Sequence, residues 1–122
     1  MNTTYNNWYG PYQLNKGSID TNVTDGTSLG NYILSLGTKP NSNELSFDYV
    51  GRAHDEPVKD RIKDHLTDDL KCCTHFWVMY KQTAEETFDQ ECRDYHRYNP
   101  KLNKEHPASL PNSTRKCPVC GC

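Results

Sequence analysis

The sequence has no net positive charge, no long apolar run and no apparent secretion signal. No cationic start followed by apolar residues stands near Met1, and no stretch approaches the roughly 20 apolar residues of a membrane-spanning helix. We therefore expect a soluble, intracellular, cytoplasmic protein without a membrane partner. A formal charge of -2 and a pI near 6.2 argue against a broad phosphate-binding surface, because non-specific affinity for nucleic acid grows with the number of cations placed against phosphates.

Apolar residues are also scarce, at 34% of the chain with a mean hydropathy of -0.96. The eight tyrosines and two tryptophans compensate, since aromatic side chains bury a large area each. A chain of 122 residues predicts a single domain with one modest core. Composition divides it into a polar N-terminal arm (residues 1–28), a body (residues 29–107) and a cysteine-containing tail (residues 108–122).

The body contains periodic segments that predict an α+β fold. Alternating apolar residues indicate two strands over residues 30–36 and 45–52, joined as a hairpin by a turn-rich loop, and a third strand over residues 75–80. Apolar residues at helical spacing predict one helix over residues 57–66 and another over residues 84–98, which begins at a capping box and ends before Pro100. The expected order is β-β-α-β-α, a three-stranded antiparallel sheet flanked by helices. No helix or strand is predicted in the arm.

Polar residues attached to these elements form an ordered set that resembles the GIY-YIG nuclease family over about residues 29–107. The family pattern is a Gly-x-Tyr strand, a Tyr-x-Gly strand, an arginine one helix later, and then a glutamate whose helix ends before proline and asparagine. The matching positions are Gly30-Asn31-Tyr32, Tyr49-Val50-Gly51, Arg61, Glu91, Pro100 and Asn103. The loop between the two tyrosines is longer than is usual in the family.

The resemblance implies a metal-dependent endonuclease that hydrolyses phosphodiester bonds in DNA, with Mg²⁺ or Mn²⁺ as the catalytic metal. It also implies that Tyr32 or Tyr49 activates the attacking water and that Arg61 stabilises the phosphate. Glu91 would bind the metal and Asn103 would brace the site. His65 stands four positions beyond Arg61, as a histidine does in several family members, and could relay a proton or contact phosphate; the alternative is a buried histidine satisfied by a carbonyl.

The residue chemistry agrees with those roles but leaves alternatives open. Hydrolysis of a phosphodiester needs a general base, a cation against the phosphoryl oxygens and usually a divalent metal. Glu91 falls on the buried flank of its predicted helix, where a metal or a salt bridge to Arg61 or Lys59 would compensate its charge. Further cations for binding the substrate are clustered at Arg52, Lys59 and Lys63.

Each tyrosine could instead be a cross-strand packing partner. A free tyrosine has a pKa near 10, so one that acts as a base must have its pKa lowered by neighbouring cations such as Arg52 or Arg61.

The cysteines predict a structural zinc site rather than disulfides, because no secretion signal accompanies them and Cys117-Pro118-Val119-Cys120 has metal-binding spacing. Cys92 and His96 share one face of the second helix and would complete a Cys3His site with this pair. His106 and Cys122 are the alternates. In the competing interpretation Cys92 is a small core residue and the tail holds free thiols.

Two functions follow from these patterns. The first is the nuclease, acting on nucleic acid with a zinc-bound tail as a structural support. The second is a catalytically inactive domain of the same fold that binds nucleic acid or a partner protein. The complete set of tyrosines, arginine, glutamate and asparagine favours the enzyme, because a binding module has no need for a buried carboxylate beside a phosphate site.

Overall fold

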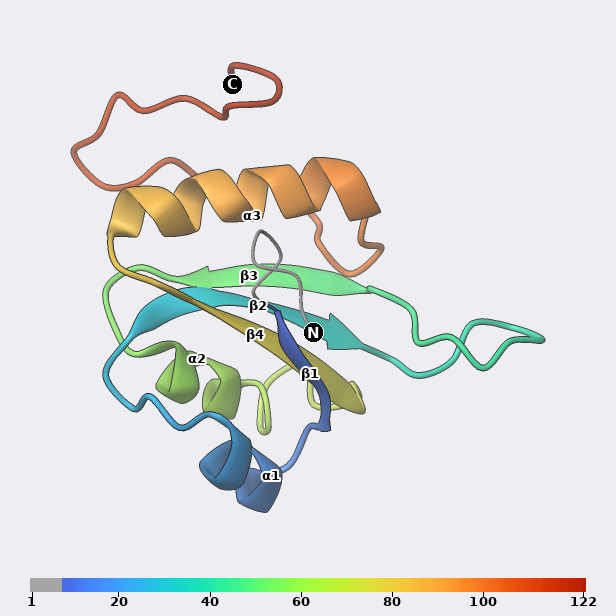
Figure 1. Ribbon diagram of the computed structural model, residues 1–122. Coiled ribbons are helices and arrows are strands. Elements are labelled where there is room, and N and C mark those ends of the chain that lie inside the picture. Colours follow the sequence, from blue (N-terminus) through green and yellow to red (C-terminus); the bar gives the residue numbers. More distant parts are fainter. Residues whose placement is uncertain (1–7) are drawn as a thin grey trace.

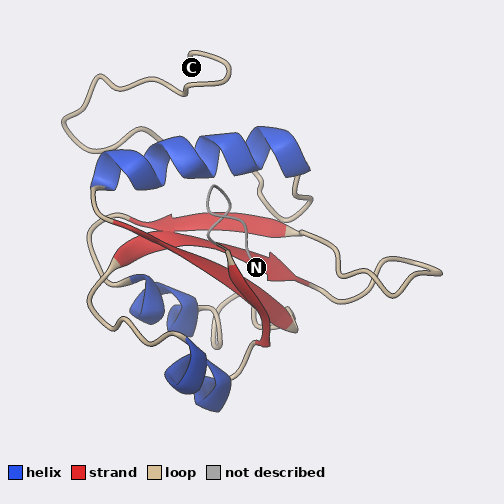
Figure 2. Ribbon diagram, in the orientation of Figure 1, coloured by secondary structure: helices blue, strands red, loops and turns tan. Residues whose placement is uncertain are grey.

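The computed structural model describes residues 8–122 as a four-stranded antiparallel sheet with helices on both faces (Figures 1 and 2). The elements are β1 (Tyr9–Gln13), α1 (Lys16–Asn22), β2 (Leu29–Ser35), β3 (Tyr49–Ala53), α2 (Val58–Asp64), β4 (His75–Lys81) and α3 (Ala84–Tyr98). The strand order is β1-β4-β2-β3, so β2 is paired on both sides and β3 lies at an edge. α1 and α2 cover one face of the sheet, and α3 crosses the other (Figure 1).

The sheet differs from the expected one by its fourth strand. β1 belongs to the N-terminal arm and pairs with β4, and α1 follows it within the same arm. The sequence hides both elements. β1 contains Pro11, which a strand tolerates here because β1 lies at the edge of the sheet and pairs with one neighbour only. α1 buries only Ile19, so its sequence shows no apolar stripe. Residues 1–7 of the arm lie outside the described residues.

The other elements confirm the expected α+β class and the order within residues 29–98. β2 and β3 form the predicted antiparallel hairpin, although β3 begins at Tyr49, later than the alternation suggested. The capping box at Thr83 starts α3 as predicted, and Asn99 ends it with a left-handed φ of 46° just before Pro100. Within residues 8–122 no helix combines the length and the apolar character needed to cross a membrane.

The central strand β2 is buried on both faces and separates two groups of core residues. Tyr32 and Leu34 point toward α1 and α2, where they pack with Val58 and Ile62. Asn31 points toward α3, because its Nδ2 donates to the Thr87 carbonyl at 2.9 Å. A smaller apolar cluster lies between α3 and the tail, and it consists of Phe88, Cys92, Leu110 and Cys117.

Candidate active site and metal centre

A close cross-strand pair explains why a Gly-x-Tyr strand faces a Tyr-x-Gly strand in this protein. Tyr32 on β2 is directly opposite Gly51 on β3, and the Tyr32 phenol lies over the glycine. A methyl group at position 51 would come within 2.7 Å of Tyr32 Cε2 and closer still to Cζ and the hydroxyl oxygen. Glycine is therefore required here by the tyrosine, and the pair fixes where the hydroxyl points.

The Tyr32 hydroxyl begins a chain of hydrogen bonds. It lies 2.7 Å from His65 Nε2, and His65 Nδ1 lies 2.7 Å from Asp68 Oδ2 in the turn after α2. A carboxylate can only accept, so Nδ1 carries the proton and Nε2 is left to accept from the tyrosine. Burial lowers the pKa of His65, although Asp68 opposes that effect, so the imidazole is neutral near pH 7 and free to take a proton.

The tyrosines themselves do not have lowered pKa values. Burial raises the pKa of Tyr32 well above its usual range, and nearby Arg61 opposes the shift without cancelling it. Burial, with a contribution from the Glu91 charge, also raises the pKa of Tyr49. Both phenols therefore carry their protons near neutral pH, and the basic atom of the site is His65 Nε2. The expected lowering of the tyrosine pKa by nearby cations is therefore outweighed by the burial of the phenol groups.

Glu91 lies on α3 and is paired with Arg52 on β3. Arg52 Nη1 donates to Glu91 Oε1 at 3.0 Å, and both side chains are about nine-tenths buried. Burial raises the pKa of the Glu91 carboxyl, while Arg52 works to lower it. The expected alternative of a salt bridge thus occurs, but with Arg52 rather than Arg61 or Lys59. Glu91 Oε2 accepts no hydrogen bond from the part of the chain that the structure describes.

These groups meet at a pocket of about 340 Å³ that we call the β3 pocket. Because β3 is an edge strand and Gly51 has no side chain, the pocket draws on both faces of the sheet. It is lined by Tyr32, Tyr49, Gly51, Arg52, His54, Asp55, Glu56, Arg61, Glu91 and Ala108. Arg61 Nε is buried and has no hydrogen-bond partner among the described residues, so the pocket wall contains an unsatisfied cationic donor.

Asn103 lies outside this pocket and hydrogen-bonds to the backbone of β3. Its Oδ1 accepts from the Val50 backbone N–H and its Nδ2 donates to the Val50 carbonyl, both at 2.9 Å. The side-chain amide thereby takes the place of a neighbouring strand along the open edge of β3. It holds the backbone between Tyr49 and Gly51, the two residues of that strand that line the pocket.

The predicted substrate-binding cations lie in different surroundings. Arg52 is fully engaged, since besides Glu91 it donates to the Ala108 carbonyl at 2.7 Å and to His54 Nδ1 at 3.3 Å. Lys59 and Lys63 are outside the β3 pocket, with both ammonium groups directed at Asp20 of α1, at 3.6 and 2.6 Å. Of the predicted phosphate contacts, Arg61 is the one that combines a place in the pocket with an unused donor.

A His/Cys group that can hold a metal ion such as zinc lies between the end of α3 and the tail. The ligand atoms of His96, His106, Cys117 and Cys120 are all within 4.8 Å of one another. In a tetrahedral zinc site the ligand atoms are about 3.3–3.8 Å apart. The His96 and His106 Nε2 atoms are 3.2 Å apart, and Cys120 Sγ is 3.4 Å from His106 Nε2, close to that spacing.

Neighbouring backbone groups orient these ligands. His106 Nδ1 is 2.9 Å from the Pro107 carbonyl, a contact that places the proton on Nδ1 and leaves Nε2 for a metal. The Val119 N–H points at Cys117 Sγ at 3.4 Å. Gly121 follows with a φ of 77°, a left-handed conformation that suits glycine in the turn closing the Cys-x-x-Cys segment.

This ligand group differs from the predicted one at a single position. Cys92 is fully buried in the apolar cluster with Phe88 and Leu110, as in the competing core interpretation, and His106, an alternate, stands with the other three ligands. Cys122, the second alternate, is outside the group. The left-handed turn at Asn99 reverses the chain and returns residues 100–107 toward α3, which spacing along the sequence does not reveal.

Two positions of the candidate site were missed in the sequence. Asp68 stands three residues after His65, a spacing that could have suggested a contact if the helical turn were extended past α2. The Ala108 carbonyl, which holds Arg52, has no sequence signal because every residue carries the same backbone group.

Comparisons of the chain with family models, with curated proteins and with solved structures found no match. Function must therefore be inferred from the geometry of the site itself.

Proposed function

We propose that this chain is a metal-dependent endonuclease that hydrolyses phosphodiester bonds in DNA by a GIY-YIG-type mechanism. The observation that carries the proposal is the Tyr32–His65–Asp68 hydrogen-bond chain, which ends at a pocket that also holds Arg61 and Glu91. The site offers a group for each requirement of the reaction: a hydroxyl in the pocket with the proton acceptor His65 behind it, a cation for the phosphate and a carboxylate for a metal.

Tyr32 and His65 move the proton. As water attacks phosphorus, it gives a proton to the Tyr32 oxygen while the Tyr32 proton passes along the 2.7 Å hydrogen bond to His65 Nε2. The bond from phosphorus to the leaving oxygen breaks in the same displacement, and the leaving oxygen takes a proton from solvent. The imidazolium that forms is stabilised by the Asp68 carboxylate at 2.7 Å. This route needs no tyrosinate in the resting protein, which agrees with the raised pKa of Tyr32. Tyr49, stacked on Tyr32 with ring centroids 6.2 Å apart, holds the Tyr32 ring in place.

Arg61 binds the phosphate, because an anion in the β3 pocket would satisfy its buried and unpaired Nε. Glu91 fits a divalent ion as a single carboxylate ligand, since Oε2 has no partner in residues 8–122 while Arg52 orients the group through Oε1. When bound, Mg²⁺ supplies positive charge against the developing negative charge on the phosphoryl and leaving oxygens.

The second candidate is a domain that binds nucleic acid through Arg61 without cutting it. The Arg52–Glu91 salt bridge favours this reading, because a carboxylate already paired with an arginine does not require a metal. The two candidates differ in one measurable respect: the enzyme needs the Tyr32 hydroxyl, while the binding module needs only Arg61.

The test is cleavage of labelled single- and double-stranded DNA by the full chain with Mg²⁺ or Mn²⁺. We expect Tyr32→Phe, Glu91→Gln and Arg61→Ala each to lower the turnover on the order of 10² or more. Tyr9→Phe is the matched control, because Tyr9 is a half-exposed tyrosine outside the β3 pocket, and it should cleave at the wild-type rate.

Circular dichroism checks that each variant is folded. Wild-type cleavage by Glu91→Gln under saturating Mg²⁺ would disprove the assignment of the site. A wild-type chain that binds DNA through Arg61 and cuts none of it would establish the binding module instead.

A further inference from the structure

The first residue of the tail forms part of the wall of the β3 pocket. Ala108 lines that pocket, and its carbonyl accepts a hydrogen bond from Arg52 Nη2 at 2.7 Å. The other terminal nitrogen of the same guanidinium, Nη1, donates to Glu91 Oε1 at 3.0 Å. A guanidinium is planar and rigid, so a contact at one nitrogen also fixes where the other nitrogen points. The tail and the Glu91 carboxylate are therefore linked through one side chain.

A short, stiff segment joins this contact to the metal centre. Ala108 is two residues after His106, one of the four residues that can hold a metal ion. Between them Pro107 is buried, and the proline ring restricts its backbone. The Pro107 carbonyl also lies 2.9 Å from His106 Nδ1. Because two residues span at most about 7 Å, an ion bound at His106 also restrains the Ala108 carbonyl.

The other contacts between the tail and α3 are weak. Residues 108–122 form no helix or strand. Leu110 is the buried apolar side chain of the tail besides the ligand Cys117. Arg115 donates to the Asp89 carboxylate at 2.6 and 2.9 Å, but its side chain is 45% exposed, and such surface pairs contribute about 1 kcal/mol or less. The tail therefore depends on a metal ion for most of its attachment.

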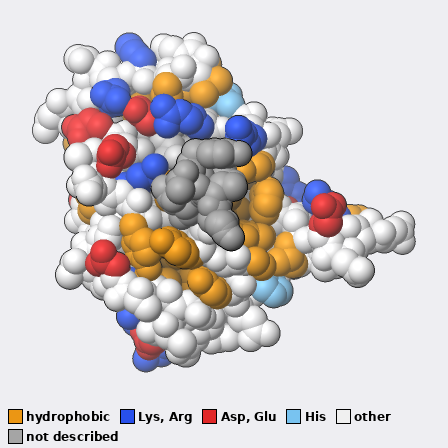
Figure 3. Space-filling view, in the orientation of Figure 1, with side chains coloured by type: hydrophobic (Ala, Val, Ile, Leu, Met, Phe, Trp, Pro, Cys, Tyr) orange, Lys and Arg blue, Asp and Glu red, His pale blue; other side chains and the backbone are white. Residues whose placement is uncertain are grey.

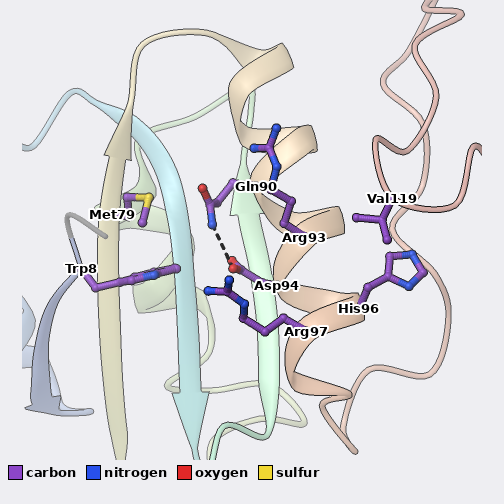
Figure 4. A pocket seen from close by; sticks show the side chains of 8 residues that line it. All are labelled: Trp8, Met79, Gln90, Arg93, Asp94, His96, Arg97 and Val119. Carbon is purple, nitrogen blue, oxygen red and sulfur yellow. Dashed lines mark hydrogen bonds between the residues drawn. The ribbon is translucent and has the colours of Figure 1, made fainter. Parts of the chain in front are cut away.

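The junction between α3 and the tail is polar at its surface and is crossed by the metal ligands. In the space-filling view, charged side chains of both signs gather over α3 and the tail (Figure 3). In the close view, His96 extends from α3 toward the tail, and Val119 of the Cys-x-x-Cys segment lines the same pocket from the other side (Figure 4). A single ion at the His/Cys group would join α3, the chain reversal after it and the end of the tail.

We propose that the His/Cys group is a zinc-dependent lock on the β3 pocket. A zinc ion bound there holds the tail on α3 and the Ala108 carbonyl against Arg52, which keeps Glu91 in place and closes one wall of the pocket. Loss of the ion releases the tail and opens that wall, while the sheet keeps its core with α1 and α2. The use of this opening to control cleavage rests on the proposed function, whereas the coupling itself does not.

Two buried cysteines report on the opening. Cys92 is fully buried in the cluster that includes Leu110 of the tail, whereas Cys73 is buried in the core shared with α1 and α2. The experiment is alkylation of the full chain with iodoacetamide before and after zinc is removed with EDTA, followed by mass spectrometry of the labelled peptides. Zinc removal should speed the labelling of Cys92 on the order of 10-fold or more and leave Cys73 protected. Adding zinc back should protect Cys92 again.

The reverse coupling tests the role of Arg52. Energetic coupling between two sites is reciprocal, so weakening the Ala108 contact must weaken zinc binding. Arg52→Lys keeps the charge beside Glu91 but removes the planar fork that holds both groups. It should lower zinc affinity on the order of 10-fold, the effect of one hydrogen bond to a charged group. Arg93→Lys, the same change at an exposed arginine of α3, should leave the affinity unchanged when both variants are measured by competition with a chromophoric chelator.

Three results would overturn the proposal. The first is a Cys92 that stays protected in the zinc-free chain, or a chain that binds no zinc. The second is equal labelling of Cys92 and Cys73, since the whole domain would then have unfolded. The third is an unchanged zinc affinity in Arg52→Lys. Neither measurement involves DNA, so failure here leaves the nuclease proposal standing, and a chain that cuts no DNA would not contradict the lock.

Discussion

Replacing Gly51 with alanine tests the packing at the centre of the β3 pocket. The new methyl group would lie 2.7 Å from Tyr32 Cε2 and closer to two further atoms of the ring. Tyr32 is fully buried and stacked on Tyr49, so its ring can move only by giving up this packing. The ring or the β3 backbone must shift, and the 2.7 Å hydrogen bond to His65 breaks when the hydroxyl moves.

The expected loss is the sum of two effects. Overpacking a well-packed core costs about 1–3 kcal/mol, and the lost buried hydrogen bond adds about 1 kcal/mol. The free energy of unfolding should therefore fall by about 2–4 kcal/mol. At roughly 4 °C per kcal/mol for a domain of this size, the Tm should fall by roughly 8–16 °C.

The assay is urea and thermal unfolding followed by circular dichroism, with Gly26→Ala as the matched control. Gly26 has no atom within 4 Å of the position that a methyl group would occupy, so this variant should be as stable as wild type or slightly more so. A Gly51→Ala chain whose unfolding free energy stays within about 0.5 kcal/mol of wild type would refute the packing argument. The comparison is independent of any activity.

Two further predictions concern the metal centre and the histidine. Purified protein should carry about one zinc ion per chain. The His106→Ala variant should lose the zinc, whereas Cys92→Ala, a change in the core, should retain it but unfold more easily. If His106→Ala kept the zinc and Cys92→Ala lost it, the Cys3His ligand set would be the correct one. Because burial lowers the pKa of His65, the unfolded chain binds the proton more tightly. The contribution of neutral His65 to stability is therefore present above the pKa of about 6.5 in the unfolded chain, and it is lost as the pH falls through the lower pKa in the folded chain. The His65→Gln variant should therefore show a flatter pH dependence of Tm between pH 7 and 5, as measured by calorimetry.

Local patterns were sufficient for most of the fold. The alternation around Ile33, the stripe containing Val58 and Ile62, and the capping box at Thr83 each depend on residues close together in the chain, and the structure contains the corresponding strand and helices. β1 and α1 escaped because one carries a proline at a sheet edge and the other buries a single side chain. Elements held by one-sided contacts leave little periodicity to detect.

The candidate site was predicted as a set of residues but not as a set of contacts. Tyr32, Tyr49, Arg61 and Glu91 do line one pocket. The partner of Glu91, however, is Arg52, because Arg52 alternates with Gly51 along β3 and so faces α3, whereas Arg61 lies on the opposite face of the sheet with α2. Helix spacing alone could not show on which side of the sheet each helix packs.

The sequence by itself determined the strands and helices within residues 29–98 and the four side chains Tyr32, Tyr49, Arg61 and Glu91 that line the β3 pocket, because side-chain identity and short-range periodicity are properties of neighbouring residues. Only the tertiary structure decided that His106 rather than Cys92 joins the group that can hold a metal ion, that Asp68 hydrogen-bonds to His65, and that Asp94 Oδ2 is buried without a hydrogen-bond partner among residues 8–122. Each of these contacts depends on how segments that are distant in the sequence come together in the folded chain. Such long-range contacts are set by how the layers pack, and no local pattern encodes them.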